Sequence, residues 1–195
     1  KSGLIDGTDK IKTSFKEVYL DRVFYVDFYA IERFGKTKLG QLLLYSKQSQ
    51  DKKMIKNLSL IIKDKIDFLI KEYEIDAVCF IPPTVKREVQ LMKELEKNLK
   101  LSVKKINIVK IKSDIVVPQK TLNKIEDRIE NAEKTFYLND NGGHNNILII
   151  DDAVGSGSTL NVVAQKIKKA NINKGKIIGL AITGSYKGFD VISEV

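Results

Sequence analysis

The stretch from residue 147 to residue 159 constrains the fold of this chain more than any other. Four apolar β-forming residues precede Asp151 and Asp152, and a Gly- and Ser-rich loop at 155–159 then leads into an apolar-periodic helix. The uninterrupted apolar run predicts a strand that is buried on both faces, as in a parallel sheet covered by helices. In open α/β sheets ligands bind at the carboxyl ends of such strands. The two carboxylates and the loop therefore mark the expected site.

The rest of the chain repeats this alternation of strands and helices. Apolar runs predict one or two strands within 15–30 and further strands at 75–81, 105–111, 135–138, 147–150 and 176–183. Apolar residues at three- and four-residue steps predict a helical piece near 122–131 and helices at 38–46, 51–73, 84–99 and 158–170. The expected fold class is α/β, an open, mainly parallel sheet with helices on both faces. We expect residues 1–50 to form N-terminal strands and a short helix, as a hood or a linker, and 51–195 to form the core.

The bulk composition excludes several classes of protein. The chain has 195 residues with a formal net charge of +9, and no apolar stretch approaches the length of a membrane span. Its one cysteine, Cys79, lies in an apolar run, which excludes disulfides within the chain and favours a cytoplasmic location. Lysines carry most of the positive charge and are spread along the chain. This distribution favours solvated helix faces over a dedicated nucleic-acid surface, with DNA left open as a partner.

The loop at 155–159 has the composition of an anion-binding site. Its glycines let the backbone close around a phosphate, and its N–H groups lie at the positive end of the helix dipole. No lysine follows Gly157 as in a Walker A loop, and the three spaced glycines of a dinucleotide fingerprint are missing. Asp151 and Asp152 could simply cap the loop and helix, but adjacent like charges favour hydroxyl donors or a cation between them. Together these residues favour a phosphorylated sugar as the ligand.

The order and spacing of 147–159 resemble the phosphoribosyl-pyrophosphate motif of type I phosphoribosyltransferases. The resemblance implies that Asp151 and Asp152 are catalytic residues that hold the ribose hydroxyls and Mg²⁺. It also implies a 5′-phosphate site formed by Ala153, Val154, Gly155, Ser156, Gly157, Ser158 and Thr159. Position 155 departs from the family, which usually has Thr there, so one hydroxyl contact is lost.

Two further segments, 118–136 and the stretch at 29–47 ahead of the long predicted helix, resemble the ComF-like, competence-type branch of this family. Residues 81–87 stand where the family has its pyrophosphate-binding loop, with contacts implied for Pro83, Thr84, Lys86 and Arg87. A proline at 83 also lowers the cost of a cis peptide bond. Residues 118–136 carry a Gln-Lys…Leu…Arg…Asn…Phe pattern, which implies that Lys120 and Arg128 act catalytically by closing over the pyrophosphate. The cysteine zinc module and the Arg-Gly-Phe-Asn-Gln run of ComF-type proteins are missing from this sequence.

The resemblance implies a Mg²⁺-dependent phosphoribosyltransferase that binds phosphoribosyl pyrophosphate or a nucleotide, with a homodimer left open. The alternative is a catalytically silent domain that senses a nucleotide or serves as an adaptor for DNA or a DNA-processing protein. The segment after the last predicted strand, 184–189, offers little material for recognising an acceptor base, which favours the alternative. His144, the only histidine, lies in an Asn- and Gly-rich turn, where we expect it to be exposed.

Overall fold

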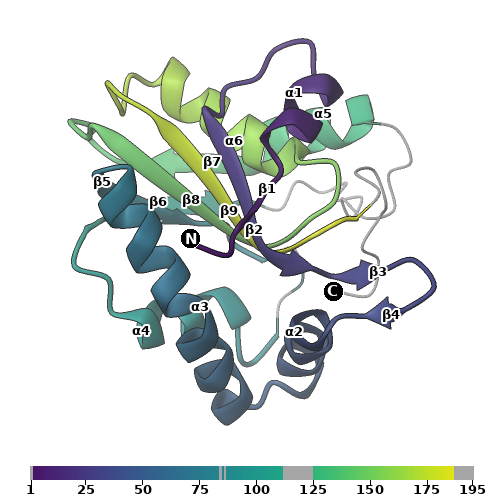
Figure 1. Ribbon diagram of the computed structural model, residues 1–195. Helices are drawn as coiled ribbons and strands as arrows, with labels where there is room; N and C mark the ends of the chain where they lie inside the picture. The colour runs from purple at the N-terminus through teal and green to yellow at the C-terminus, as the bar shows by residue number, and fades with distance from the viewer. Residues whose placement is uncertain (1, 84, 86, 112–124, 187–195) are drawn as a thin grey trace.

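The computed structural model contains a mainly parallel sheet. The structure describes residues 2–83, 85, 87–111 and 125–186, except for the side chains at 125–128 and 131. Within this part of the chain, the sheet has seven strands in the order β1-β2-β9-β8-β5-β6-β7 (Figure 1). They are β1 (Ile5–Asp6), β2 (Arg22–Phe28), β5 (Ile75–Phe80), β6 (Lys104–Lys110), β7 (Phe136–Asn139), β8 (Asn146–Val154) and β9 (Ile177–Gly184). The strands from β2 to β6 in this order run parallel, and β1 and β7 pair antiparallel at the two edges.

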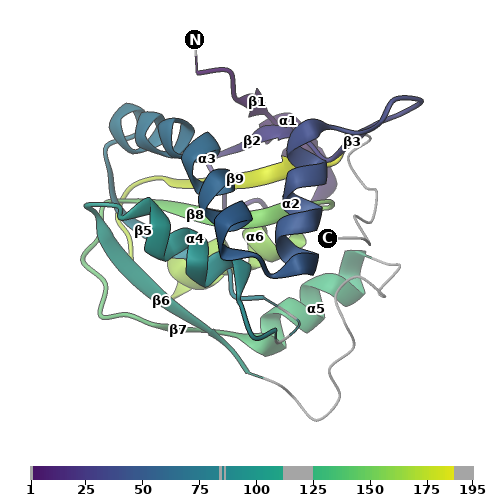
Figure 2. The same ribbon diagram turned by 90° about the horizontal axis from the view of Figure 1, so that it is seen from below.

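Helices cover both faces of the sheet, which confirms the predicted α/β class (Figures 1 and 2). One face packs against α1 (Thr8–Ser14), α5 (Ile125–Thr135) and α6 (Ser158–Lys169). The other face packs against α2 (Lys38–Ser49), α3 (Lys52–Glu72) and α4 (Leu91–Leu99). A small hairpin of β3 (Ala30–Ile31) and β4 (Gly35–Lys36) follows β2. Among the described helices, none combines the length and the apolar character needed to cross a membrane.

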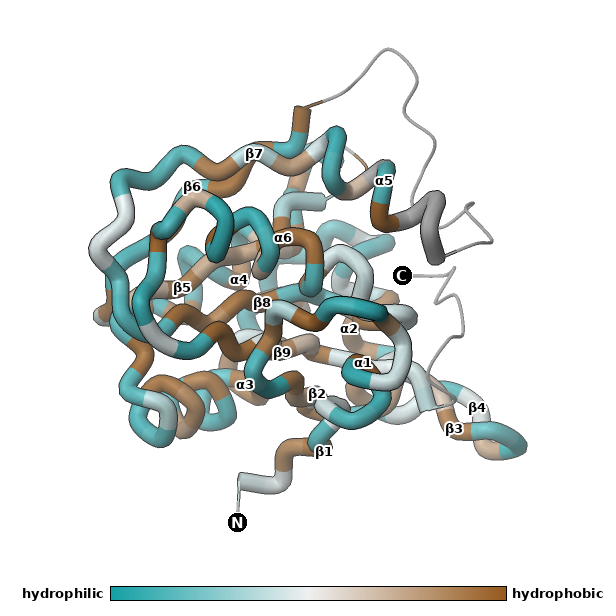
Figure 3. Tube along the Cα trace, turned by 90° about the horizontal axis from the view of Figure 1, so that it is seen from above, coloured by the Kyte–Doolittle hydropathy of each residue, from teal (hydrophilic) through white to brown (hydrophobic). Residues whose placement is uncertain are grey.

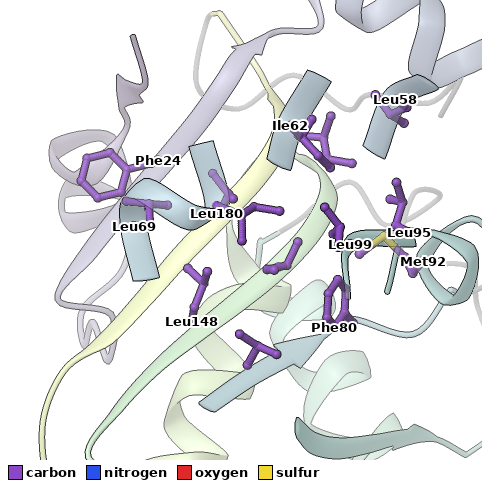
Figure 4. Packing of buried hydrophobic residues seen from close by; sticks show 14 of the residues in the cluster. Phe24, Leu58, Ile62, Leu69, Phe80, Met92, Leu95, Leu99, Leu148 and Leu180 are labelled. Atoms are coloured by element: carbon purple, nitrogen blue, oxygen red, sulfur yellow. The ribbon is translucent and has the colours of Figure 1, made fainter. Parts of the chain in front are cut away.

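Alternate residues of the central strands supply the two halves of the core. Leu148 and Leu180 lie on the face of α3 and α4, where Leu69 and Leu99 gather over them (Figure 4). Their chain neighbours Ile147 and Ile149 enter the second cluster, against α6. Each such side chain stabilises the fold by about 1.5–3 kcal/mol when fully buried. Figure 3 shows the resulting pattern, with hydrophobic residues in brown along β8 and β9 and hydrophilic ones in teal on the periphery.

Several predicted elements are confirmed with nearly the same bounds. The elements that the sequence did not predict lie mainly in the N-terminal region. The helices expected at 51–73 and 158–170 are α3 and α6. Strand β1 and helix α1 were not predicted. Strand β2 belongs to residues 1–50, which we expected to lie outside the core, and it lies inside the sheet between β1 and β9.

The helix predicted at 84–99 begins only at Leu91 in the structure, so the prediction of helical turns before Leu91 is wrong. The segment before Leu91 bonds elsewhere. The backbone N–H of Val89 donates to Gln50 Oε1 at 3.0 Å, and the Gln90 side-chain amide donates to the Arg87 carbonyl at 2.6 Å. The first contact ties the loop to the residue just after α2, and the second lies within the loop, so this segment does not continue the helix.

Candidate functional site

The two aspartates lie within strand β8 rather than after it. The strand was expected to end at Ile150, but it continues to Val154 because its register with β9 is maintained. Asp151 lies opposite Ala181, and the backbone N–H of Ser185 donates to the Val154 carbonyl at 2.9 Å. Ala153 and Val154, expected in the phosphate loop, are therefore strand residues opposite Thr183 and Gly184. The loop itself is reduced to residues 155–157.

Strand β8 directs Asp152 toward helix α2. Its side chain meets Lys47 of α2, on the face of the sheet that α2, α3 and α4 cover. Side chains alternate between the two clusters from Ile147 to Ile150, but the alternation does not continue to the end of the strand, because Ala153 packs against the first cluster and Val154 belongs to the second. Strand parity therefore does not set the surroundings of Asp151.

Asp151 is buried, with 9% of its surface exposed. Its pKa is raised to about 7, first by burial and then by the charge of Asp152. The backbone N–H of Asp152, which donates to Asp151 Oδ1 at 2.8 Å, and the charges of Lys47 and Lys110 act in the opposite direction. A carboxyl group of this kind is part protonated near neutral pH, so it can both donate and accept a hydrogen bond.

Asp152 forms an ion pair with a residue that sequence reasoning missed. The Lys47 ammonium, near the end of α2, lies 2.5 Å from Asp152 Oδ2. The side chains are only 15% and 16% exposed, respectively. The Arg87 guanidinium in turn donates to the Lys47 carbonyl. Because 105 residues separate Lys47 from Asp152 and α2 carries other lysines, no local signal in the sequence distinguishes Lys47 from a solvated lysine.

The loop between β8 and α6 is compact and its serine hydroxyls are buried. Gly157 is the N-cap of α6 with φ +81°, a conformation that favours glycine. A Cβ at this position would lie 2.2 Å from Ile11 Cδ1 of α1, so the loop also packs against the N-terminal region. Ser156 Oγ and Ser158 Oγ are 3.0 Å apart and hydrogen-bonded to each other. Gly157 supplies no side-chain acceptor to the first turn of α6, where a bound anion would be favourable.

The predicted pyrophosphate loop follows β5, and only part of it falls in the described residues. Pro82 and Pro83 are joined by a trans bond, so the suggested cis bond does not occur there. Thr84 and Lys86 lie outside the described residues. A cavity of about 340 Å³ lies beside the prolines, between α4 and β6, with lining residues that include Met92, Lys93, Lys97 and Lys105.

The predicted lid lies mostly outside the described residues. Lys120 falls in the undescribed range 112–124, and Arg128 lies in α5 with its side chain outside the description. Their roles stay predictions.

An aromatic pair stands at the carboxyl ends of β2 and β9, and it was not predicted. The rings of Phe28 and Tyr186 meet edge to face with centroids 5.1 Å apart. The Lys10 ammonium lies 5.6 Å from the Phe28 ring centroid and 2.6 Å from the Tyr186 carbonyl oxygen. Tyr186 is 47% exposed, and the Lys10 ammonium also lies 6.0 Å from its ring centroid.

His144 is buried, which corrects the expectation that it is exposed. Its Nε2 lies 2.9 Å from Asp140 Oδ1, and its backbone bridges to Asn173 at the opposite end of β8 from the aspartates. Within the described residues no group of three or more His, Cys, Asp or Glu side chains is arranged to hold a metal ion. With Asp152 paired to Lys47, the aspartates do not fit a resident Mg²⁺ in this arrangement.

Comparisons with known proteins give weak structural similarities only. No family model matches the sequence, and no curated protein matches it. A hypoxanthine phosphoribosyltransferase from Staphylococcus aureus aligns at 15% identity and TM-score 0.37, covering 71% of this chain and 67% of the enzyme. A purine phosphoribosyltransferase from Pyrococcus horikoshii aligns at 15% identity and TM-score 0.33, covering 64% and 80%. Superpositions of this quality carry no residue roles or activity over to this chain.

Proposed function

We propose that this chain binds phosphoribosyl pyrophosphate or a nucleotide through its ribose 5-phosphate unit. The observation that carries the proposal is the continuous run of Asp151, Asp152 and the glycine-capped start of α6 at the carboxyl end of a central parallel strand. Ligands of open α/β sheets bind at this edge. The amino end of α6 would take the 5′-phosphate, and the carboxyl groups would accept hydrogen bonds from ribose hydroxyls.

Two other features support contacts with the rest of such a ligand. Arg87, held beside Lys47, stands in the loop after β5 and would face the pyrophosphate. Phe28 and Tyr186 would stack against a base. In phosphoribosyl transfer the bond from C1 to pyrophosphate oxygen breaks, pyrophosphate keeps the electron pair, and a base nitrogen bonds to C1 while its N–H proton passes to solvent. Catalysis would rest on positioning and charge, and Mg²⁺ would enter bound to the ligand's phosphates.

Calorimetric titration of phosphoribosyl pyrophosphate with Mg²⁺ present tests the proposal. We expect the double variant Asp151→Asn with Asp152→Asn to lose binding that the wild type shows. Asp67→Asn is the matched control, because it removes an exposed carboxylate on α3 that pairs with Lys63. Equal affinity in the wild type and the double variant would refute the proposed site.

A second candidate is binding without turnover, in a nucleotide-sensing domain or a ComF-like adaptor. It is favoured by the ion pair that occupies Asp152 and by the mutual hydrogen bond of Ser156 and Ser158, which both engage polar groups that a substrate would need. Pyrophosphate release in the presence of a panel of nucleobases would support the enzyme. Salt-dependent retention on DNA without pyrophosphate release would support the adaptor.

A further inference from the structure

Helix α2 places Lys47 at the site through tight backbone packing. Its N-cap Thr37 accepts a hydrogen bond from the Gly40 N–H at 3.0 Å and donates one to the Phe28 carbonyl at 2.6 Å. A Cβ on Gly40 would lie 2.1 Å from the Tyr29 carbonyl oxygen, so only glycine lets the helix approach the end of β2 this closely. Figures 1 and 2 show α2 beside the carboxyl ends of β2 and β9. The position of Lys47 is therefore set by the fold.

The end of α2 is also connected to the loop after β5. Arg87 donates to the Lys47 carbonyl, and Val89 donates to the Gln50 side chain just past the helix. Lys47 thus stands where three parts of the site meet: strand β8, helix α2 and the loop that holds Arg87.

The Lys47 ammonium group pairs with Oδ2, one of the two carboxylate oxygens of Asp152. Mg²⁺ and Mn²⁺ bind oxygen ligands, and a site with one carboxylate already paired to lysine offers them little. The pair is largely shielded from solvent, with Lys47 15% and Asp152 16% exposed, so its attraction is stronger than that of a surface pair. Among the described residues, no third His, Cys, Asp or Glu joins Asp151 and Asp152 to complete a set of metal ligands.

We propose that Lys47 is a positioning residue that serves as the built-in counter-ion of Asp152, in place of a divalent cation, and keeps this carboxylate oriented for a ribose hydroxyl. The proposal rests on the proposed function for its ligand, a ribose 5-phosphate unit. Its consequence for the free protein does not need that ligand. In the free protein, the Lys47 charge disfavours a divalent cation at the aspartates, and a variant without this charge binds such a cation there more tightly.

Mn²⁺ alone, followed by electron paramagnetic resonance at low salt, tests this consequence. We expect Lys47→Met to bind Mn²⁺ at least about tenfold more tightly than the wild type, because a shielded carboxylate without its counter-ion recruits another. The gain should vanish in Lys47→Met with Asp152→Asn. Lys38→Met, which removes an exposed lysine charge at the start of the same helix, should match the wild type. A merely structural role for Lys47 would not create a metal site.

Saturable Mn²⁺ binding by the wild type that Asp152→Asn abolishes would overturn the proposal, as would unchanged affinity in Lys47→Met. If Lys47→Met does not fold by circular dichroism, Lys47→Gln keeps an uncharged polar end on the side chain and must show the same gain. Ribose 5-phosphate titrated in EDTA and in Mg²⁺ separates the two proposals. Failure of every variant to bind the sugar phosphate would refute the proposed function, while the Mn²⁺ result would still decide the role of Lys47.

Discussion

Replacing Asp151 with Asn should stabilise the protein in a pH-dependent way. The folded state raises the pKa of this carboxyl from 3.8 to about 7, chiefly by burial, so its favourable contribution is complete below about pH 4 and is lost as the pH rises to about 7. At about 1.4 kcal/mol for each pKa unit, the change amounts to about 4 kcal/mol. Because Asn carries no charge at either pH, the stability of the variant relative to the wild type should grow by about this amount between pH 4 and pH 8.

Urea unfolding followed by circular dichroism at single-unit pH steps measures this difference. The comparison with Asp67→Asn removes effects of net charge, because Asp67 is an exposed carboxylate on the same chain. A difference between the Asp151 variant and the wild type that stays constant from pH 4 to pH 8 would refute the reasoning. Such a result would mean that Lys47 and Lys110 hold the carboxyl ionised despite its burial.

Three further changes test other parts of the site. Thr37→Ala removes the N-cap of α2 and should lower the free energy of unfolding in urea by about 1 kcal/mol. An unchanged free energy of unfolding would show that this cap does not stabilise the helix. Gly157→Ala introduces a Cβ at φ +81° and against Ile11, so thermal unfolding should show a loss of more than about 1 kcal/mol, and an unchanged midpoint would contradict the loop packing. Tyr186→Ala should weaken nucleotide binding by about 0.5–1.5 kcal/mol and leave ribose 5-phosphate binding unchanged; equal losses for both ligands would argue against stacking with Phe28.

Long regular signals in the sequence predict most of the fold. The apolar periodicity over 51–73 predicts α3, and the uninterrupted apolar run before Gly184 predicts β9. Both signals are strong because every turn or every residue of the element is buried against a neighbour. The glycine-capped start of α6 could be predicted for a related reason, since few residues other than glycine adopt the conformation at position 157.

Contacts between distant segments escape such patterns. Nothing near Asp152 indicates that β8 continues through it, because the extension depends on the register with β9. The apolar spacing of Val89 with the helix that follows suggests extra helical turns, but its backbone bonds to Gln50 instead. Lys47 reaches the site only through the close approach of α2 to β2, which the sequence shows as no more than a glycine inside a helix.

The position of Lys47 has a consequence for how this site can diversify. Lys47 pairs with Asp152, and its charge also lowers the pKa of Asp151, which the charge of Asp152 raises. A substitution at Lys47 in α2 therefore changes both carboxyl groups at once. Libraries that vary Lys47 and the two aspartates must vary them together, because their effects are not additive.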